Sequence, residues 1–358
     1  MKTKEEFDQY YEKELMPVIQ SLEERRLSIL KKFSYKLYRR TLLALLLIII
    51  MLAIYNGVIP DFPELVLALT VLSSVLFTAF FPLYIFIRRN LSSEPINVDY
   101  KKNVITKIIS FIDNQLNYTS GSGIDLTEFR QNLIHSEKVF LKSFQSEDLV
   151  SGKFNDYNIR FADVKISYRV GPRTKGSNDN SLLNCVYVIV KSDYIYTSQT
   201  NLYHVHFLLA PIKMINDAVE TLTKTVLSPV VELSNNMIGE SITNKLFGHF
   251  NDNAYHTKNT VFDNTFGIWS NNHEETKKIL TDQFQNELLN LIRSSGIQIN
   301  IGFCNNEIHL AVLNSDLFET DVHVSLLNAS HRISTAKYYD IIGNIYKLLE
   351  IIKTSRKD

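Results

Sequence analysis

Two histidines stand two residues apart in the segment YHVHF, which contains His204 and His206. Side chains at positions i and i+2 of a strand lie on the same face, so these two imidazoles could share a metal ion. A metal site needs a third ligand and usually a fourth, and neither His249 nor His256 has a spacing that identifies it as one. A pair of surface or partly buried histidines explains the pattern better than a metal site does. We therefore predict no metal and no cofactor, and keep His204 and His206 only as candidate ligands.

The two cysteines, Cys185 and Cys304, are far apart in the sequence, and neither belongs to a CxxC pair. This spacing predicts neither a disulfide framework nor a zinc site. We expect two buried thiols in a reducing compartment.

Catalytic motifs are missing from the chain. A GxSxG elbow, an HExxH pair and a Walker loop are absent, and the glycines of GSG at 121–123 lack the spacing of a phosphate-binding loop. Catalytic triads can assemble from residues that are distant in sequence, so an enzyme is not excluded. The sequence nevertheless favours a role without catalysis, and we predict no catalytic residue.

Charge is balanced overall but unevenly placed. The chain has 38 Lys and Arg against 38 Asp and Glu, a net charge of zero that gives no sign of nucleic-acid binding. Residues 25–40 contain seven Lys or Arg and no acid. A basic amphipathic segment of this kind is found in contact with anionic lipid, but more commonly such residues only set membrane topology.

Two apolar runs follow this basic segment, at 42–59 and 65–87. About 20 apolar residues in a helix cross a hydrocarbon core, so we predict a transmembrane hairpin over residues 41–88. Because cytoplasmic flanks are rich in Lys and Arg, both termini should be cytoplasmic, in a two-pass protein of the bacterial cytoplasmic membrane. The predicted membrane-surface contacts are Lys31, Lys32, Lys36, Arg39, Arg40, Arg88 and Arg89.

Residues 1–40 are predicted to form a helical arm. The apolar residues of this arm recur at three, four or seven residues, which places them near one helix face. They are Phe7, Tyr11, Leu15, Val18, Leu22, Ile29 and Phe33. The stripe fits a helix that packs on its own soluble domain, and it also fits a short coiled coil with another subunit.

Residues 98–358 are predicted to form a cytoplasmic α+β domain of mainly antiparallel sheet with helices. Two subdomains, 98–210 and 260–358, would be joined by a helical segment at 211–250. Within Tyr157–Val170 the apolar residues change parity, which predicts a β-bulge near Ala162 and Asp163.

Among the elements predicted in this domain are two turns and two helices. Asn155 and Asp156 indicate a tight hairpin turn. Asn305 and Asn306 indicate another, which would pair Phe303 with Ile308, Ile301 with Leu310 and Ile299 with Val312. One helix is predicted over 273–295, closed by Gly296, and the last is predicted to begin at Ser334.

The order of these elements resembles a bacterial membrane-protein family catalogued as domain of unknown function 3137. The resemblance rests on segments such as FDQYYEKELMPVIQSLEERR, SEDLVSGKFNDYNIRFADVKISY, FGIWSNNHEETKKILTDQF and INIGFCNNEIHLAVLNSDLFE. It implies a membrane-anchored cytoplasmic α+β domain without established activity, and it transfers no functional residue.

Three functions remain open from the sequence. The first is a membrane-anchored binding or scaffold protein, whose partners would be the lipid bilayer and either another protein or a second copy of the chain. The second is a membrane-tethered metal-dependent hydrolase that uses His204 and His206. The third is a ligand or stress sensor that signals through the hairpin.

Overall fold

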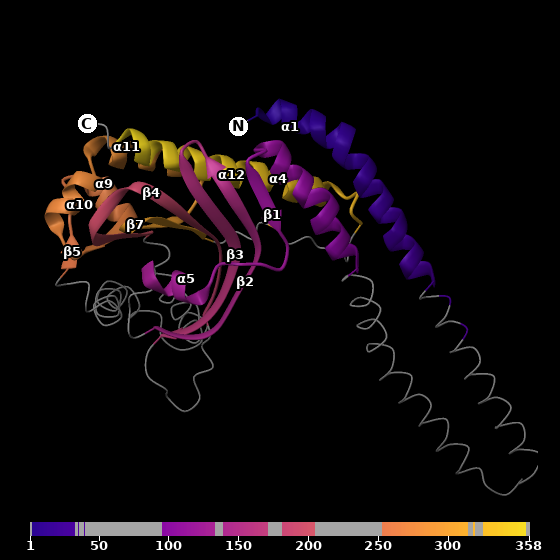
Figure 1. Cartoon of the computed structure of the whole chain (residues 1–358), viewed down its shortest axis with the longest axis horizontal. Helices are drawn as coiled ribbons and strands as arrows, with labels where there is room; N and C mark the ends of the chain where they lie inside the picture. The colour runs from indigo at the N-terminus through magenta and orange to yellow at the C-terminus, as the bar shows by residue number, and fades with distance from the viewer. Residues whose placement is uncertain are drawn as a thin grey trace, which may run out of the picture. The chain divides into compact units, whose positions relative to one another are not determined.

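The computed structural model describes residues 2–32, 35, 39, 95–132, 139–170, 181–204, 253–313, 318 and 325–355 (Figure 1). The chain forms two compact units. Unit 1 contains residues 109–319 and 336–358, and unit 2 contains residues 2–108 and 320–335.

Unit 1 is built on an antiparallel sheet. In the described part of the chain its strands follow the order β1-β2-β3-β4-β6-β5, and β7 pairs with β4. The strands are β1 (Leu116–Thr119), β2 (Val139–Phe154), β3 (Tyr157–Val170), β4 (Ser181–His204), β5 (Ala254–Tyr255), β6 (Phe266–Ser270) and β7 (Ile299–Leu313). The predicted combination of antiparallel sheet and helices is therefore present.

Strand β7 folds back on itself. The backbone N–H of Leu313 donates to the carbonyl of Gln298 at 2.8 Å, although a straight strand would separate these residues by about 50 Å. Asn305, at the point of return, has a φ of 50°. The predicted turn pairs Ile299 with Val312, and one step further from the turn the same register pairs Gln298 with Leu313. The observed hydrogen bond joins these two residues, so the predicted turn is confirmed.

Strand β4 bends around the tip of β7. Lys191 lies opposite Glu307, and Thr200 lies opposite Phe303, so β4 advances nine residues where β7 takes only four. The five extra residues in β4 form a bend around the turn of β7, with Tyr196 opposite Asn305. We call residues 192–198 the β4 bend.

The hairpin between β2 and β3 closes as predicted, with Phe154 paired to Tyr157. The predicted bulge in β3 is wrong. Strand β3 pairs with β4 without interruption, whereas the register with β2 shifts between Glu147 and Val150. The extra residue therefore belongs to β2, where Asp148 has a φ of 64°.

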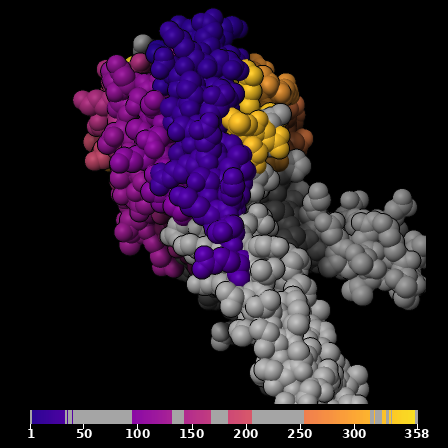
Figure 2. Space-filling view, turned by 90° about the vertical axis from the view of Figure 1, so that its right-hand side faces the viewer, coloured from indigo at the N-terminus to yellow at the C-terminus, as the bar shows by residue number. Residues whose placement is uncertain are grey.

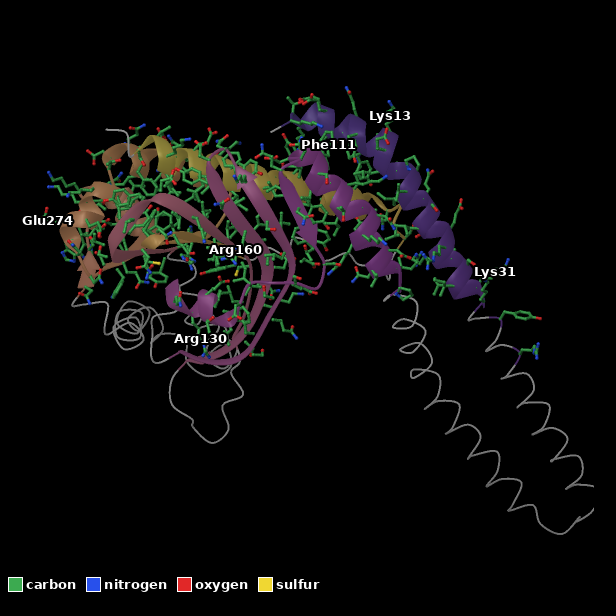
Figure 3. All side chains as sticks on the ribbon, viewed as in Figure 1. Lys13, Lys31, Phe111, Arg130, Arg160 and Glu274 are labelled. Carbon is green, nitrogen blue, oxygen red and sulfur yellow. The ribbon has the colours of Figure 1, made fainter. Side chains whose placement is uncertain are left out.

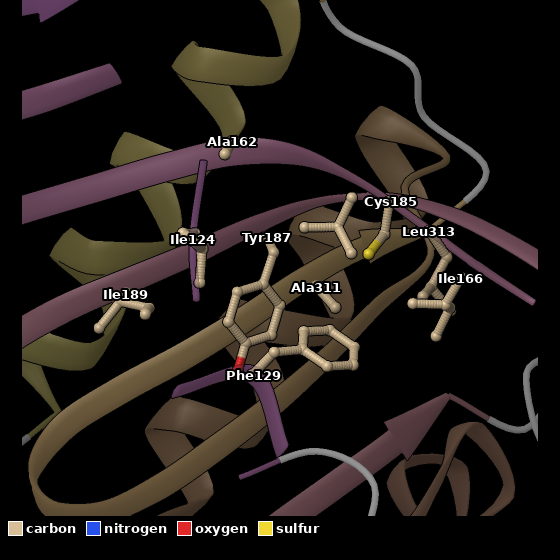
Figure 4. Packing of buried hydrophobic residues seen from close by; sticks show 10 residues of the cluster. Ile124, Phe129, Ala162, Ile166, Cys185, Tyr187, Ile189, Ala311 and Leu313 are labelled. Carbon is tan, nitrogen blue, oxygen red and sulfur yellow. The ribbon is translucent and has the colours of Figure 1, made fainter. Parts of the chain in front are cut away.

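The parity change in β3 has a different cause, which is burial on both faces of the sheet. Figure 1 shows α5 (Leu126–Asn132) against one face and α12 (Ala329–Thr354) along the other. On the α5 face one cluster forms a core (Figure 4). Its members are Ile124, Phe129, Ala162, Val164, Ile166, Cys185, Tyr187, Ile189, Ala311 and Leu313. On the α12 face Phe154 stacks on Tyr346 with ring centroids 3.6 Å apart.

The helices of the C-terminal part depart from the prediction at two points. The predicted helix over 273–295 is two helices, α10 (His273–Ile279) and α11 (Asp282–Ser295), because the Thr281 side chain caps the second one. Gly296 closes α11 with a φ of 68°, as expected. Helix α12 begins at Ala329, so Ser334 lies inside it and is not its cap. A short helix, α9 (Thr260–Thr265), precedes β6.

Unit 2 is helical. The capping box between Thr3 and Glu6 starts α1 (Lys4–Tyr10), which continues through the π-helical turn η1 (Tyr11–Leu15) and remains helical to residue 32. A second helix contains η2 (Lys101–Ile105) and enters α4 (Thr106–Ile112). Of the predicted stripe on the arm, Phe7, Tyr11, Leu15 and Leu22 are buried, Val18 and Ile29 are half-buried, and Phe33 lies outside the described residues.

The predicted membrane hairpin needs correction. Among the residues that the structure describes, no helix combines the length and the hydropathy of a membrane span. Helix α12 has 26 residues, but it carries Arg332, Lys337, Asp340, Lys347, Glu350 and Lys353. The predicted spans at 42–59 and 65–87, and the predicted helical segment at 211–250, lie outside the described residues. The structure supports an α+β fold without a transmembrane hairpin in its described part.

Candidate functional site

The histidines singled out in the sequence do not come together in the described structure. The His204 side chain is buried, with its ring edge-on to Phe266 at 5.8 Å, and His206 and His249 lie outside the described residues. His256 is exposed, and its Nδ1 lies 3.9 Å from Asp263. Within the described ranges, no three His, Cys, Asp or Glu side chains gather as metal ligands.

Both thiols are buried, as expected. Burial raises the pKa of Cys304 to about 12, and the pKa of Cys185 is raised further for the same reason. Neither thiol is ionised at neutral pH, so neither is a nucleophile or a metal-binding thiolate in this state.

A buried polar chain runs under α5 and was not foreseen from the sequence. The Tyr187 hydroxyl lies 3.1 Å from Nδ1 of His309, and Nε2 of His309 lies 3.2 Å from a carboxylate oxygen of Glu307. Because the carboxylate accepts, Nε2 carries a proton, and Nδ1 of a neutral ring then accepts from Tyr187. A signal existed in EIHLAVL, where Glu307 and His309 share one strand face.

A hydrogen bond and nearby positive charges favour the ionised form of Glu307. The hydrogen bond from His309 lowers the pKa of Glu307, and the positive charges of Arg160 and Lys191 lower it further. Arg160 also donates to Glu128 on α5, with an N–O distance of 2.8 Å (Figure 3 labels Arg160). The cluster therefore connects α5 to three strands.

This arrangement resembles an activated hydroxyl, but its environment opposes catalysis. Tyr187 and His309 are fully buried, and the Tyr187 ring packs on Phe129 at 4.8 Å. Burial raises the pKa of Tyr187 well above its ordinary value, so the phenol stays protonated. We interpret the chain as a satisfied polar network that fixes α5 and the sheet.

Two further carboxylates are buried on the sheet. Tyr118 donates to Asp148 at 2.6 Å, and the backbone N–H of Phe318 donates to Asp163 at 2.7 Å. The Phe318 ring packs between Tyr118 and Tyr338, with centroids at 5.3 and 5.7 Å. These contacts attach Phe318 to the sheet and to α12, which is a structural role.

The β4 bend presents apolar side chains to solvent. Ile195 is 69% exposed, and its neighbour Tyr194 is 42% exposed. Exposed single apolar residues are common on proteins, but two adjacent ones at the tip of an ordered bend are typical of a contact surface.

Aromatic packing against the core fixes one side of the bend. Tyr196 is buried, with its ring 4.9 Å from Tyr194 and 5.4 Å from Phe303. Phe303 in turn contacts Phe284 of α11 at 6.3 Å. The tip is thus connected to the core through a row of rings.

A buried carboxylate holds the other side of the bend. Glu275 on α10 accepts from the backbone N–H and the hydroxyl of Thr197, both at 2.9 Å, and from the hydroxyl of Ser198. Burial opposes ionisation of Glu275, but these hydrogen bonds outweigh it and leave its pKa below the ordinary value. This contact could not be predicted from the sequence, because Glu275 and Thr197 are 78 residues apart.

Of the predicted membrane-surface residues, Lys31, Lys32 and Arg39 are described, and all three are exposed. Lys36, Arg40, Arg88 and Arg89 lie outside the described residues.

The C-terminal elements carry the similarity to known proteins. Residues 215–356 match the family model described as Protein of unknown function (DUF3137). The match includes β6, β7 and α9 to α12, and therefore Glu275, Glu307 and His309. It begins after β4, so the resemblance noted for earlier segments stays a prediction. No curated protein and no solved structure matches the chain.

Proposed function

We propose that this protein is a binding or scaffold module without catalytic activity, which engages another protein through the β4 bend. The observation that carries this proposal is the exposure of Tyr194 and Ile195 at the tip of a bend whose neighbouring residues are fixed.

Burial of these two side chains supplies the binding energy. Complete burial of an apolar side chain of this size contributes about 1.5 to 3 kcal/mol. A Tyr beside an aliphatic residue is a common centre of protein interfaces, because the ring buries a large area with few rotatable bonds.

The fixed geometry of the bend keeps the entropy cost of binding small. Glu275 holds Thr197 and Ser198, and Ser192 accepts from the backbone N–H of Tyr194 at 3.1 Å. A surface that is already ordered loses less conformational freedom when a partner binds.

The apolar tip and the flanking charges of the bend indicate what surface its partner should present. Lys191 and Asp193, both exposed, flank the apolar tip with one charge of each sign. An apolar centre within a polar rim is the usual anatomy of a protein interface. The partner should therefore present an apolar pocket bordered by charges of both signs.

Site-specific photo-crosslinking tests this proposal. A photoreactive residue is placed at position 195 of the full-length protein, and at position 261 in a control. Val261 is 46% exposed on α9, so it matches Ile195 as an exposed aliphatic residue away from the bend.

We expect that crosslinking from position 195 gives a discrete adduct with one other protein, and that crosslinking from position 261 does not. The complex of the two proteins should then form again when they are mixed as purified components. Equal labelling from both positions, or no adduct at native expression, would contradict the proposal. If the adduct contained two copies of this chain, the partner would be a second copy, and this result would contradict the proposal that the bend engages another protein.

A further inference from the structure

Unit 2 carries a stripe in which apolar and basic side chains alternate. Leu27, Lys31, Tyr35 and Arg39 follow one another at intervals of four residues, which places neighbouring members on the same side of a helix. Residues 16–32 are helical, and residues 35 and 39 are helical as well. Leu27 is 52% exposed, Tyr35 is 66% exposed, and both basic residues are exposed. We call these four residues the basic stripe.

The rest of unit 2 fixes the helix that begins this stripe. Arg25 forms an ion pair with Asp99, and the buried Arg26 binds Glu23 at 2.7 Å. Glu23 also accepts from the backbone N–H of Leu326 at 3.1 Å. The helix is thus tied to two other segments of unit 2 just before Leu27, while its outer side is uncovered (Figure 2).

The charge within residues 25–40 has one sign, and an exposed acid, Glu24, lies just before this segment. Residues 25–40 contain no Asp or Glu, and Lys32 adds an exposed cation beside Lys31. Figure 3 labels Lys31 at the end of the N-terminal helix, where its side chain leaves the ribbon. Such a surface attracts anions, and its exposed Leu and Tyr favour an anionic surface that is apolar beneath its charged groups.

We propose that the basic stripe of unit 2 binds the headgroup surface of an anionic phospholipid membrane. Lys31 and Arg39 would lie among the phosphate groups, with their aliphatic parts along the membrane boundary. Leu27 would enter the boundary region, and Tyr35 would sit at headgroup level, where its ring and hydroxyl face apolar and wet surroundings. This inference concerns unit 2 and does not rest on the function proposed for the β4 bend.

Vesicle flotation with the full-length protein tests the inference. Vesicles are made of phosphatidylcholine alone or of phosphatidylcholine mixed with phosphatidylserine. The test variant carries Lys31→Ala, Lys32→Ala and Arg39→Ala. The control carries Lys277→Ala and Lys278→Ala, two exposed cations on α10. A second variant, Tyr35→Ser, keeps every charge.

The wild-type protein should partition more strongly to the phosphatidylserine vesicles, and added salt should reduce the difference. Each cation removed from the stripe should weaken this partition about fivefold. The α10 control should retain it, and Tyr35→Ser should weaken binding to both vesicle types.

Three outcomes would overturn the inference. One is equal partition of the wild type to both vesicle types, and another is an unchanged preference in the stripe variant. The third is an equal loss in the α10 control, which would show a general effect of net charge. Because all substituted residues are exposed, unchanged circular dichroism is expected for each variant.

Discussion

Nδ1 of His309 lies 3.1 Å from the hydroxyl of Tyr187, and both side chains are fully buried between α5 and the sheet. The same imidazole reaches Glu307 through Nε2. One residue therefore satisfies a buried phenol and a partly buried carboxylate together.

Removal of this histidine should destabilise unit 1. In His309→Leu the Tyr187 hydroxyl loses Nδ1 of His309 as its acceptor. A buried polar group without a hydrogen bond costs about 1 to 3 kcal/mol of stability. The double variant Tyr187→Phe/His309→Leu should regain part of that loss, because the unsatisfied hydroxyl is gone. Urea denaturation of the wild type, both single variants and the double variant measures the coupling. Additive losses would contradict the hydrogen bond.

Acid should destabilise the protein partly through Glu307. Its pKa in the folded state lies below the ordinary value of 4.5, so its contribution to stability is present above that value and is lost as pH falls through the lower, folded pKa. Glu307→Gln should be less stable than the wild type at neutral pH and should lose less stability in acid. Thermal unfolding followed from neutral pH downward measures this. Parallel curves for the two proteins would contradict it.

Gly152 should not accept a side chain. A Cβ at this position would collide with the backbone carbonyl of Gln115, next to β1, and a backbone atom cannot rotate away. Gly152→Ala should cost about 2 kcal/mol or more, as overpacking does elsewhere. Lys153→Ala, at an exposed neighbour, should change stability by no more than about 0.5 kcal/mol. Equal unfolding midpoints would show that the two strands separate more easily than their register implies.

Loss of the Glu275 contacts should loosen the β4 bend. In Glu275→Gln the side chain keeps its shape but loses the charge that strengthens the hydrogen bonds from Thr197 and Ser198. Hydrogen exchange across the bend should become faster. Glu274→Gln, at the exposed neighbour labelled in Figure 3, should leave exchange unchanged. Unchanged exchange in both variants would mean that the aromatic row alone holds the bend.

Short-range sequence signals predicted the local parts of the fold. The turns at Asn155–Asp156 and Asn305–Asn306 were readable because a tight turn and its flanking register are set by adjacent residues. The bulge was assigned to the wrong strand. Its signal in β3 came from burial on both faces, and periodicity alone cannot separate that cause from an inserted residue.

Long-range contacts were not readable from the sequence. The wrapping of β4 around β7 and the contact between Glu275 and Thr197 join segments that are between 78 and 128 residues apart, and no local sequence pattern indicates such contacts. Tyr194 and Ile195 also read as ordinary strand residues, since only the position of the bend decides that they are exposed. The candidate surface therefore emerged from the structure.

The most direct test of the central claim is the affinity of the crosslinked partner for bend variants. The purified partner is titrated against the wild type, Ile195→Asp and Val261→Asp, and unfolding is measured for each. We predict that Ile195→Asp binds about tenfold more weakly or worse, as expected for a central apolar contact, with stability unchanged. Val261→Asp should bind like the wild type. Equal affinities for all three proteins would contradict a binding role for the β4 bend.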